Sequence, residues 1–324
     1  MKESHWLFKI IKRSFLWLII TTSVAIGAIS IFLINFRPSI EFTWGVQLSL
    51  NNINNQDKLI ENLTQTLNEK WFENPQIHLE EKGSTDSLLV SLAFKDDNQV
   101  KEVSTIVNKL LIDGKYINSE EDIIGSSLNG PSISEYMKSS AINAVLAGLV
   151  LISIYMMFSF VSMRKHISPL TLAIVTMATM TFDLAIPAGA YGLWMAFNSS
   201  ITVDTTFIIS ILTIMWYSIN DTIIILDRVR ENTIKYKEWL EKGTVLYGTL
   251  IENSIRQTMR RSIGTGLAVF IMVVAMFVFG ASVMKTFAFT MGIGVIAWSF
   301  SSIFLASPLV YVLLNKWKKE FPKL

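Results

Sequence analysis

The amino-acid sequence predicts an α-helical membrane protein with six transmembrane helices and one inserted α+β domain outside the membrane. Three observations support this prediction. Hydrophobic residues make up 51% of the 324 residues and charged residues 17%, whereas soluble domains carry roughly 25% charged residues. The apolar residues are gathered in long uncharged runs. Between the first two runs lies a polar segment, 37–136, in which strand-like and helix-like patterns alternate.

Six apolar segments reach the roughly 20 residues that are needed to cross the hydrocarbon core of a bilayer. We expect transmembrane helices near 14–35, 139–162, 167–195, 204–227, 262–283 and 286–314. The first run is too long for the core of a signal peptide, and no small-residue cleavage site follows it. We therefore interpret this run as a retained transmembrane helix.

The basic residues predict which side of the membrane each loop faces. Of the 28 lysine and arginine residues, 18 lie at the two ends of the chain or in the loops after spans two and four. Because basic loops stay in the cytoplasm, we expect both termini to be cytoplasmic. The prediction divides the chain into an N-terminus with the first helix (1–36), an external domain (37–136), helices two to six (137–315) and a basic tail (316–324).

The external segment has the pattern of a folded domain. Alternating apolar residues predict strands, and apolar residues at helical spacing predict helices. In order along the chain, we expect these elements at 41–50, 57–71, 77–81, 87–94, 97–111 and 116–124. The order βαββαβ is the ferredoxin-like pattern. It identifies no function, because one fold carries many.

The composition also excludes several kinds of site. The chain has no cysteine, which excludes disulfides, thiol catalysis and cysteine-bound metal. Its three histidines, His5, His78 and His166, lie far apart in the sequence, so we expect no histidine-built metal site. The net charge of +2 indicates no nucleic-acid partner.

Two acids inside the predicted spans are the candidate functional residues. An acid in the hydrocarbon core costs at least ~2.5–3.5 kcal/mol on insertion scales, so its default interpretation is functional. Asp221 lies well inside the fourth span, between Asp204 and Arg228. Asp183 lies near the middle of the third span, and we expect a kink there because Pro187 cannot donate a hydrogen bond to the Asp183 carbonyl.

Each candidate also has a structural interpretation. The alternative for Asp221 is a buried ion pair that only fixes helix packing, and the alternative for Asp183 is plain helix packing. Asp227 lies at the edge of the membrane, where a solvated charge cluster is the simpler interpretation. The spacing does not decide whether Arg260 or Arg261 pairs with Asp221.

The fourth and fifth spans carry motifs that resemble a known family. Residues 217–222 (Tyr-Ser-Ile-Asn-Asp-Thr) and 227–232 (Asp-Arg-Val-Arg-Glu-Asn) resemble the signature of the SecF family of protein-export membrane subunits. Residues 254–262 resemble its next motif, Ser-x-x-Gln-Thr-x-x-Arg-[Thr/Ser]. Shorter matches lie at 41–45, 130–131, 182–183, 204, 279–280 and 301–308. The resemblance covers nearly the whole chain.

The resemblance implies a role in protein export. It implies a complex with SecD beside the SecYEG channel in the bacterial inner membrane, where an ion gradient helps to draw unfolded secretory polypeptides outward. It implies no enzymatic reaction and no cofactor other than a proton or sodium gradient.

The resemblance also implies roles for individual residues. Asp221 takes the place of the family's proton-responsive acid and Arg261 that of its partner arginine, and Asp183 is a further proton-coupling candidate. We expect protonation of Asp221 to weaken its pairing with Arg261 and to shift the helices. The supporting residues of the motif are Tyr217, Ser218, Asn220, Thr222, Asp227 and Arg228.

Three residues depart from the family pattern. Trp44, Phe182 and Trp216 stand where the family has a glycine, a histidine and a glycine. Other functions stay open at this point. They are half of a transporter for small molecules or lipids of the resistance–nodulation–division type, and a scaffold without catalytic function. An intramembrane aspartyl protease using Asp183 and Asp221 is disfavoured, because its Gly-x-Gly-Asp motif is absent.

Overall fold

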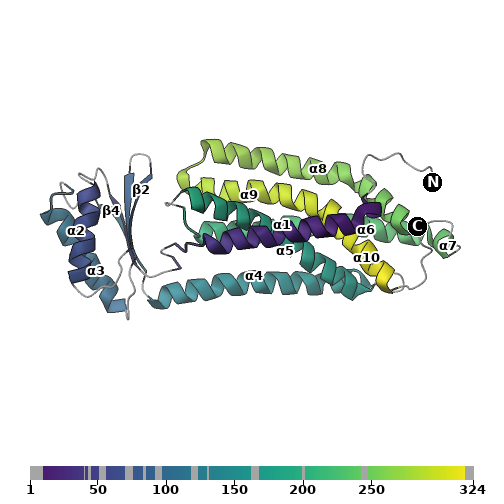
Figure 1. Cartoon of the computed structure of the whole chain (residues 1–324), viewed down its shortest axis with the longest axis horizontal. Helices are drawn as coiled ribbons and strands as arrows, with labels where there is room; N and C mark the ends of the chain where they lie inside the picture. The colour runs from purple at the N-terminus through teal and green to yellow at the C-terminus, as the bar shows by residue number, and fades with distance from the viewer. Residues whose placement is uncertain are drawn as a thin grey trace. The chain divides into compact units, whose positions relative to one another are not determined.

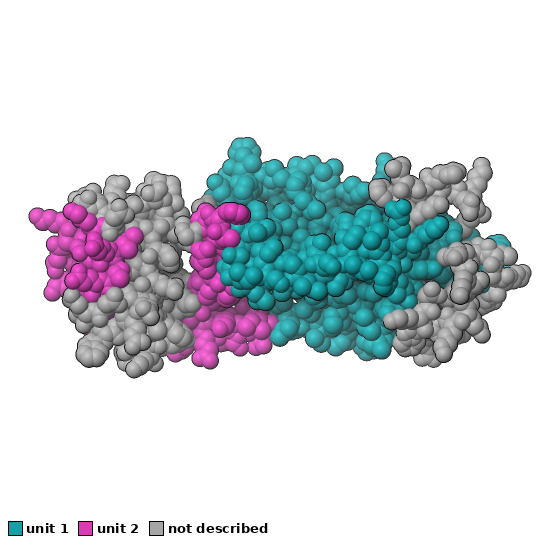
Figure 2. Space-filling view, viewed as in Figure 1, with its two compact units in different colours: residues 1–35, 145–193, 209–324 teal, residues 36–144, 194–208 magenta. Residues whose placement is uncertain are grey.

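The computed structural model describes most of the chain. The described residues are 10–39, 41–42, 45–50, 56–69, 76–82, 85–91, 97–117, 123–129, 131–161, 168–198, 201–241 and 247–317. The chain forms two compact units, coloured teal and magenta in Figure 2. The first comprises 1–35, 145–193 and 209–324, and the second comprises 36–144 and 194–208.

Six helices among the described residues are long and apolar enough to cross a membrane, as the sequence predicts. Five of the spans are single α-helices, and the sixth is built from three consecutive pieces (Figure 1). The single helices are α1 (Ser14–Ile34), α4 (Pro131–Ser159), α5 (Pro169–Phe197), α6 (Thr205–Lys235) and α8 (Tyr247–Phe279). The sixth span consists of α9 (Ser282–Ser301), the π-helix η4 (Ser302–Ala306) and α10 (Ser307–Trp317). Two short elements are η1 (Ile11–Arg13) and α7 (Lys237–Glu241).

Proline and glycine mark several helix boundaries. α4 and α5 each begin with a proline. Proline lacks an N–H group, and the first residue of a helix needs none, because an N–H there would have no intrahelical acceptor. α8 and α9 are separated only by Gly280 and Ala281. The Gly280 N–H donates to the Met276 carbonyl over 2.8 Å, and a Cβ atom at Gly280 would lie 2.3 Å from that oxygen. The tight turn therefore requires glycine.

The loop predicted between spans four and five is much shorter in the structure. Residues 228–235 continue α6 and residues 247–261 begin α8, so Arg228 lies in one helix and Arg261 in the other. The buried residues of these extensions are Val229, Asn232, Thr233, Tyr247, Gly248, Leu250, Ile251, Ser254, Ile255 and Thr258. The prediction is based on hydropathy, which shows only where the apolar part of a helix ends. An amphipathic helix continues past that point because its apolar face packs against neighbouring helices.

The segment 37–136, which the sequence predicts to lie outside the membrane, contains four strands and two helices. In chain order these are β1 (Gly45–Leu50), α2 (Gln56–Glu69), β2 (Gln76–Lys82), β3 (Thr85–Ser91), α3 (Asp97–Asp113) and β4 (Ile123–Asn129). The strands form one antiparallel sheet in the order β2-β3-β1-β4. In β1, Val46 lies opposite Val90 of β3 and Leu128 of β4.

The two helices of the external segment lie on the same face of this sheet (Figure 1). Their inward side chains are fully buried, because the apolar residues recur at helical spacing. These residues are Leu59, Leu63 and Leu67 of α2 and Val103, Val107 and Leu111 of α3. Residues 83 and 84, between β2 and β3, lie outside the described residues.

The last predicted strand, 116–124, is misplaced, because β4 begins only at Ile123. Tyr116 and Ile117 instead close the end of α3, and both donate their N–H groups to the Leu111 carbonyl. Lys115 adopts a φ of 55° at this turn. The Tyr116 hydroxyl accepts a hydrogen bond from Asn62 of α2 over 2.5 Å. Tyr116 and Ile117 therefore close the C-terminal end of α3. An alternation of apolar and polar residues does not distinguish such a helix end from a strand.

α1 approaches α5 closely because α5 presents two glycines to it. A Cβ atom at Gly189 would lie 2.6 Å from the Cα of Ala28, and one at Gly192 would lie 2.7 Å from the Cα of Phe32. Small residues of this kind allow two membrane helices to pack backbone against backbone. The attachment of the first span to the bundle therefore depends on the absence of side chains at these positions.

We expect Gly189→Ala to destabilise the protein by about 1–3 kcal/mol, because the added methyl group must push α1 away. Gly27→Ala on α1 is the matched control, because nothing lies within 4 Å of a Cβ atom there. Alanine also favours a helix over glycine by up to about 1 kcal/mol. Thermal unfolding of the purified variants in detergent measures the difference. Equal melting temperatures for Gly189→Ala and Gly27→Ala would contradict this packing.

Candidate functional site

The Asp221 carboxyl group is buried between three helical elements. It is carried by α6 and is 6% exposed. Its Oδ1 atom accepts a hydrogen bond from the Ser262 hydroxyl of α8 over 2.5 Å. Its Oδ2 atom accepts one from the Ser302 hydroxyl of η4 over 2.9 Å. Each carboxyl oxygen is thus bonded to a different neighbouring helical element.

The second intramembrane acid lies close to the first. Asp183 of α5 is 1% exposed, and its Oδ2 atom accepts a hydrogen bond from the Ser218 hydroxyl over 2.5 Å. Ser218 precedes Asp221 by three residues in α6, so the two lie on one side of that helix. Ser218 thus donates to one acid and shares a helix side with the other. The structure therefore brings both sequence-predicted acids into one polar cluster.

Two polar atoms of this region find no hydrogen-bond partner among the described residues. They are Oδ1 of Asp183 and the hydroxyl oxygen of Thr222, and both are buried.

Arg261 lies beside the cluster but does not form its nearest contact. Within the described part of the chain, no ion pair joins the Arg261 and Asp221 side chains. The Arg261 side chain is exposed on this chain, as is that of Arg260. Successive residues of a helix point about 100° apart, and here Ser262, the next residue, points at the acid. Asp221 is therefore hydrogen-bonded by hydroxyl groups and not by the arginine.

The π-helix places its first residue in the site. Ser302 begins η4, and the Ser307 hydroxyl donates to the Ser302 carbonyl over 3.3 Å. Pro308 has no N–H, so regular α-helical hydrogen bonding is interrupted at this point of the span. Single π turns of this kind occur frequently at functional sites.

The neighbouring motif residues have different environments. Tyr217 stacks on Trp298 of α9 with ring centroids 5.1 Å apart. Asn220 is exposed. Of the residues that depart from the family pattern, Phe182 is buried and stacks on Phe300, whereas Trp216 is 70% exposed and points away from the cluster. Trp44 lies outside the described residues.

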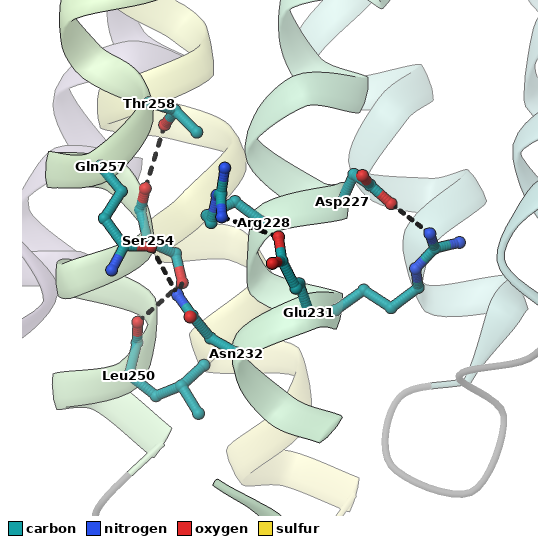
Figure 3. Close-up of polar contacts among 9 residues, drawn as sticks. Asp227, Arg228, Glu231, Asn232, Leu250, Ser254, Gln257 and Thr258 are labelled. Carbon is teal, nitrogen blue, oxygen red and sulfur yellow. Dashed lines mark hydrogen bonds and ion pairs between the residues drawn. The ribbon is translucent and has the colours of Figure 1, made fainter. Parts of the chain in front are cut away.

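The far end of the motif ties α6 to α8 (Figure 3). The Asn232 side chain donates to the Ser254 hydroxyl over 2.8 Å and to the Gln257 side-chain oxygen over 3.0 Å. Asn232 and Ser254 are both buried. This amide bridge fixes the relative positions of the two helices that supply Asp221 and Ser262.

The charged residues of the motif lie on a more exposed side of α6 (Figure 3). Asp227 pairs with Arg230 over 2.6 Å, and Arg228 pairs with Glu231 over 2.7 Å. Both pairs join residues three apart on the same helix and remain solvent-accessible. Pairs of this kind contribute little stability.

Sequence reasoning singled out both acids and Ser218 but missed Ser262 and Ser302, the two serine partners of Asp221. A signal was present in α8, where Ser254, Thr258 and Ser262 recur every four residues and form a hydroxyl stripe on one helical face. All three are buried. No comparable periodicity identifies Ser302, because its contact depends on the π turn. Among the described residues, no group of three or more histidine or acidic side chains is arranged to hold a metal ion.

Comparisons with known proteins place these residues in a family context. The profile of the family "Protein export membrane protein SecD/SecF, C-terminal" matches residues 113–316. The protein translocase subunit SecF of Sebaldella termitidis is 29% identical over 308 residues, covering 95% of this chain and 91% of that protein. SecDF of Thermus thermophilus is 29% identical over 300 residues, covering 91% of this chain and 37% of that protein.

A solved structure also resembles the chain. The crystal structure of SecDF from Thermus thermophilus superimposes with a TM-score of 0.73 at 26% sequence identity. The match covers 96% of this chain and 40% of that one. The chain therefore spans less than half the length of the SecDF proteins and most of the length of the SecF protein.

We expect Asn232→Ala to destabilise the protein by about 1–3 kcal/mol, because it removes the amide bridge and leaves the buried Ser254 without its donor. Arg228→Ala is the control on the same helix. It breaks only an exposed ion pair, so its expected cost is about 0–1 kcal/mol. Thermal unfolding in detergent compares the two. If Arg228→Ala costs as much as Asn232→Ala, the amide bridge has no special role.

Proposed function

The chain belongs to the SecD/SecF family of protein-export membrane proteins, and from that premise we propose that it is a SecF-like translocase subunit. In this proposal it works with SecD to couple an ion gradient to the outward movement of unfolded secretory polypeptides. The match to SecF over 95% of the chain carries the proposal. Two buried acids inside apolar spans support it, because intramembrane acids mark ion pathways.

The finer assignments belong to the same proposal. The chain acts beside the SecYEG channel in the bacterial inner membrane, with both termini in the cytoplasm. The external domain is ferredoxin-like, an assignment that its order β1-α2-β2-β3-α3-β4 and its sheet order support. The subunit moves its substrate without a chemical reaction of its own. It needs no cofactor other than a gradient of protons or sodium ions.

Asp221 is the residue that loads and releases the ion. As a charged carboxylate it accepts two hydrogen bonds, from Ser262 and Ser302. When one oxygen takes a proton, it becomes a donor and a weaker acceptor, so its hydrogen bond with the facing hydroxyl weakens or reverses direction. Because the two hydroxyls come from α8 and η4, protonation alters the contacts of α6 with both.

The remaining polar groups act through this carboxyl group. Arg261 precedes Ser262, the partner of Asp221 in α8, and brings a positive charge to this end of the site. Asp183 is the second acid of the pathway and is linked to α6 through Ser218. One charge moving through 100 mV is worth about 2.3 kcal/mol, which changes an equilibrium roughly fiftyfold. An ion gradient can therefore shift the equilibrium between two helix packings that differ in free energy by about 2.3 kcal/mol.

We expect Asp221→Asn to abolish the gradient-dependent part of protein export, because asparagine retains polar contacts but cannot take up a proton. The measurement is export of a reporter preprotein from cells depleted of their own SecF and supplied with this chain and its SecD. Asp227→Asn is the control, because Asp227 is an exposed acid of the same helix. Wild-type export by Asp221→Asn at matched membrane levels would instead favour a scaffold.

We expect Arg261→Gln to lower gradient-dependent export, because it removes the positive charge next to Ser262, the partner of Asp221 in α8. Arg260→Gln is a closely matched control: the residue type, the helix and the exposure of the side chain are the same. The same export assay compares the two variants with and without a gradient. If both variants lose the same amount of gradient-dependent export, any basic residue at this end of α8 would serve. That result would refute the specific role of Arg261.

A further inference from the structure

The segment that leads from α1 to β1 is bound to the segment that joins α5 to α6. Pro38 and Val203 form a parallel β-bridge. The Ser39 N–H donates to the Val203 carbonyl over 2.8 Å, and the Val203 N–H donates to the Arg37 carbonyl over 2.7 Å. Two backbone hydrogen bonds thus join two segments that are far apart in sequence.

Side chains extend this connection to both neighbouring helices. The Arg37 guanidinium donates to the Met195 carbonyl in the last turn of α5 over 2.6 Å. Oε2 of Glu41 accepts hydrogen bonds from the N–H group of Thr205, over 2.6 Å, and from the Thr205 hydroxyl. Thr205 is the first residue of α6. We call the set formed by Arg37, Pro38, Glu41, Val203 and Thr205 the clasp.

Glu41 caps the N-terminus of α6 from a different part of the chain. A helix start leaves N–H groups without intrahelical partners, and acidic side chains there are favoured by the helix dipole. Asp204 caps the same helix locally, since its Oδ1 atom accepts the Phe207 N–H over 2.8 Å. Burial raises the pKa of the Asp204 carboxyl group, and the negative charge of Glu41 raises it further. α6 has its own cap, so helix formation alone does not require Glu41.

Only a short stretch of chain links the clasp to the first strand of the sheet. β1 begins at Gly45, only four residues after Glu41. Each residue of extended chain spans at most about 3.6 Å. In the other direction, α6 is one continuous helix from Thr205 through Asp221 to Lys235. A displacement of α6 at Asp221 therefore displaces Thr205, and Glu41 carries that displacement toward β1.

We propose that Glu41 is a positioning residue that transmits movement of α6 to the external α+β domain. This inference rests on the proposed function and extends it, since it names the bond through which the intramembrane site acts on the domain outside. Glu41 itself takes up no ion. Its removal should leave ion loading at Asp221 intact while uncoupling that loading from export.

The first test compares Glu41→Ala with Glu41→Gln in the export assay with SecD. Glutamine retains an oxygen that can accept the Thr205 hydrogen bonds, whereas alanine does not. We expect Glu41→Ala to reduce the gradient-dependent part of export at least about fivefold, the lower end of typical coupling effects. Export without a gradient should be unchanged, and Glu41→Gln should retain most of the coupling. A wild-type response to the gradient in Glu41→Ala would overturn the proposal.

A covalent replacement of the clasp distinguishes coupling from simple stabilisation. The chain has no cysteine, so an introduced pair reacts without competition. Pro38→Cys and Val203→Cys place two thiols on bridged neighbours, whose strand spacing of about 4.8 Å suits a disulfide. Oxidation of the triple variant that also carries Glu41→Ala should restore gradient-dependent export, and a reductant should abolish it again. Failure of the formed disulfide to restore coupling would overturn the proposal.

The proposed function and this inference fail in different ways. Proton uptake by proteoliposomes containing the complex with SecD should persist in Glu41→Ala and disappear in Asp221→Asn. If Asp221→Asn has no effect on export, the proposed function is wrong. If Asp221→Asn loses the response but Glu41→Ala keeps it, only the role of Glu41 is wrong. Equal losses of export with and without a gradient in Glu41→Ala would reduce Glu41 to a structural cap.

Discussion

The hydrogen bonds that hold the Asp221 carboxyl group connect the helices on which the proposed function depends. A carboxylate in an apolar span needs partners, because charge in the hydrocarbon core is costly. Here the partners are hydroxyl groups of Ser262 in α8 and Ser302 in the last span. A change in the charge of one group is therefore felt by three helical elements together. Hydroxyl partners suit such a switch, since a hydroxyl both donates and accepts.

α6 carries the contacts that link the acid cluster to the rest of the described structure. Near its C-terminal end Asn232 binds α8, in its middle Asp221 and Ser218 contact the acid cluster, and at its start Thr205 is held by Glu41. An unbroken helix transmits displacement along its axis better than a loop does. The local cap supplied by Asp204 keeps the first turn formed. α6 is thus able to move as one body between the site and the segment that precedes β1.

The sequence was sufficient for the features that depend on composition along the chain. Long apolar runs, four of them free of charge, predicted the six spans, and the rarity of acids in such runs singled out Asp183 and Asp221. Features that depend on helix rotation were not accessible in this way. Arg261 and Ser262 are adjacent, and only the orientation of α8 shows which of them contacts Asp221. Ser302 reaches the site through a π turn, and Tyr116 closes α3 instead of starting a strand, because both depend on tertiary packing.

Proton movement through the reconstituted complex tests the central claim most directly. Proteoliposomes holding this chain and its SecD, loaded with a pH-sensitive dye, would receive an imposed proton gradient. We predict that the wild-type complex admits protons, whereas the complex carrying Asp221→Asn matches vesicles without protein. Asp227→Asn should behave as wild type. Proton entry at the wild-type rate through the Asp221→Asn complex would contradict the assignment of Asp221 as the proton-carrying group.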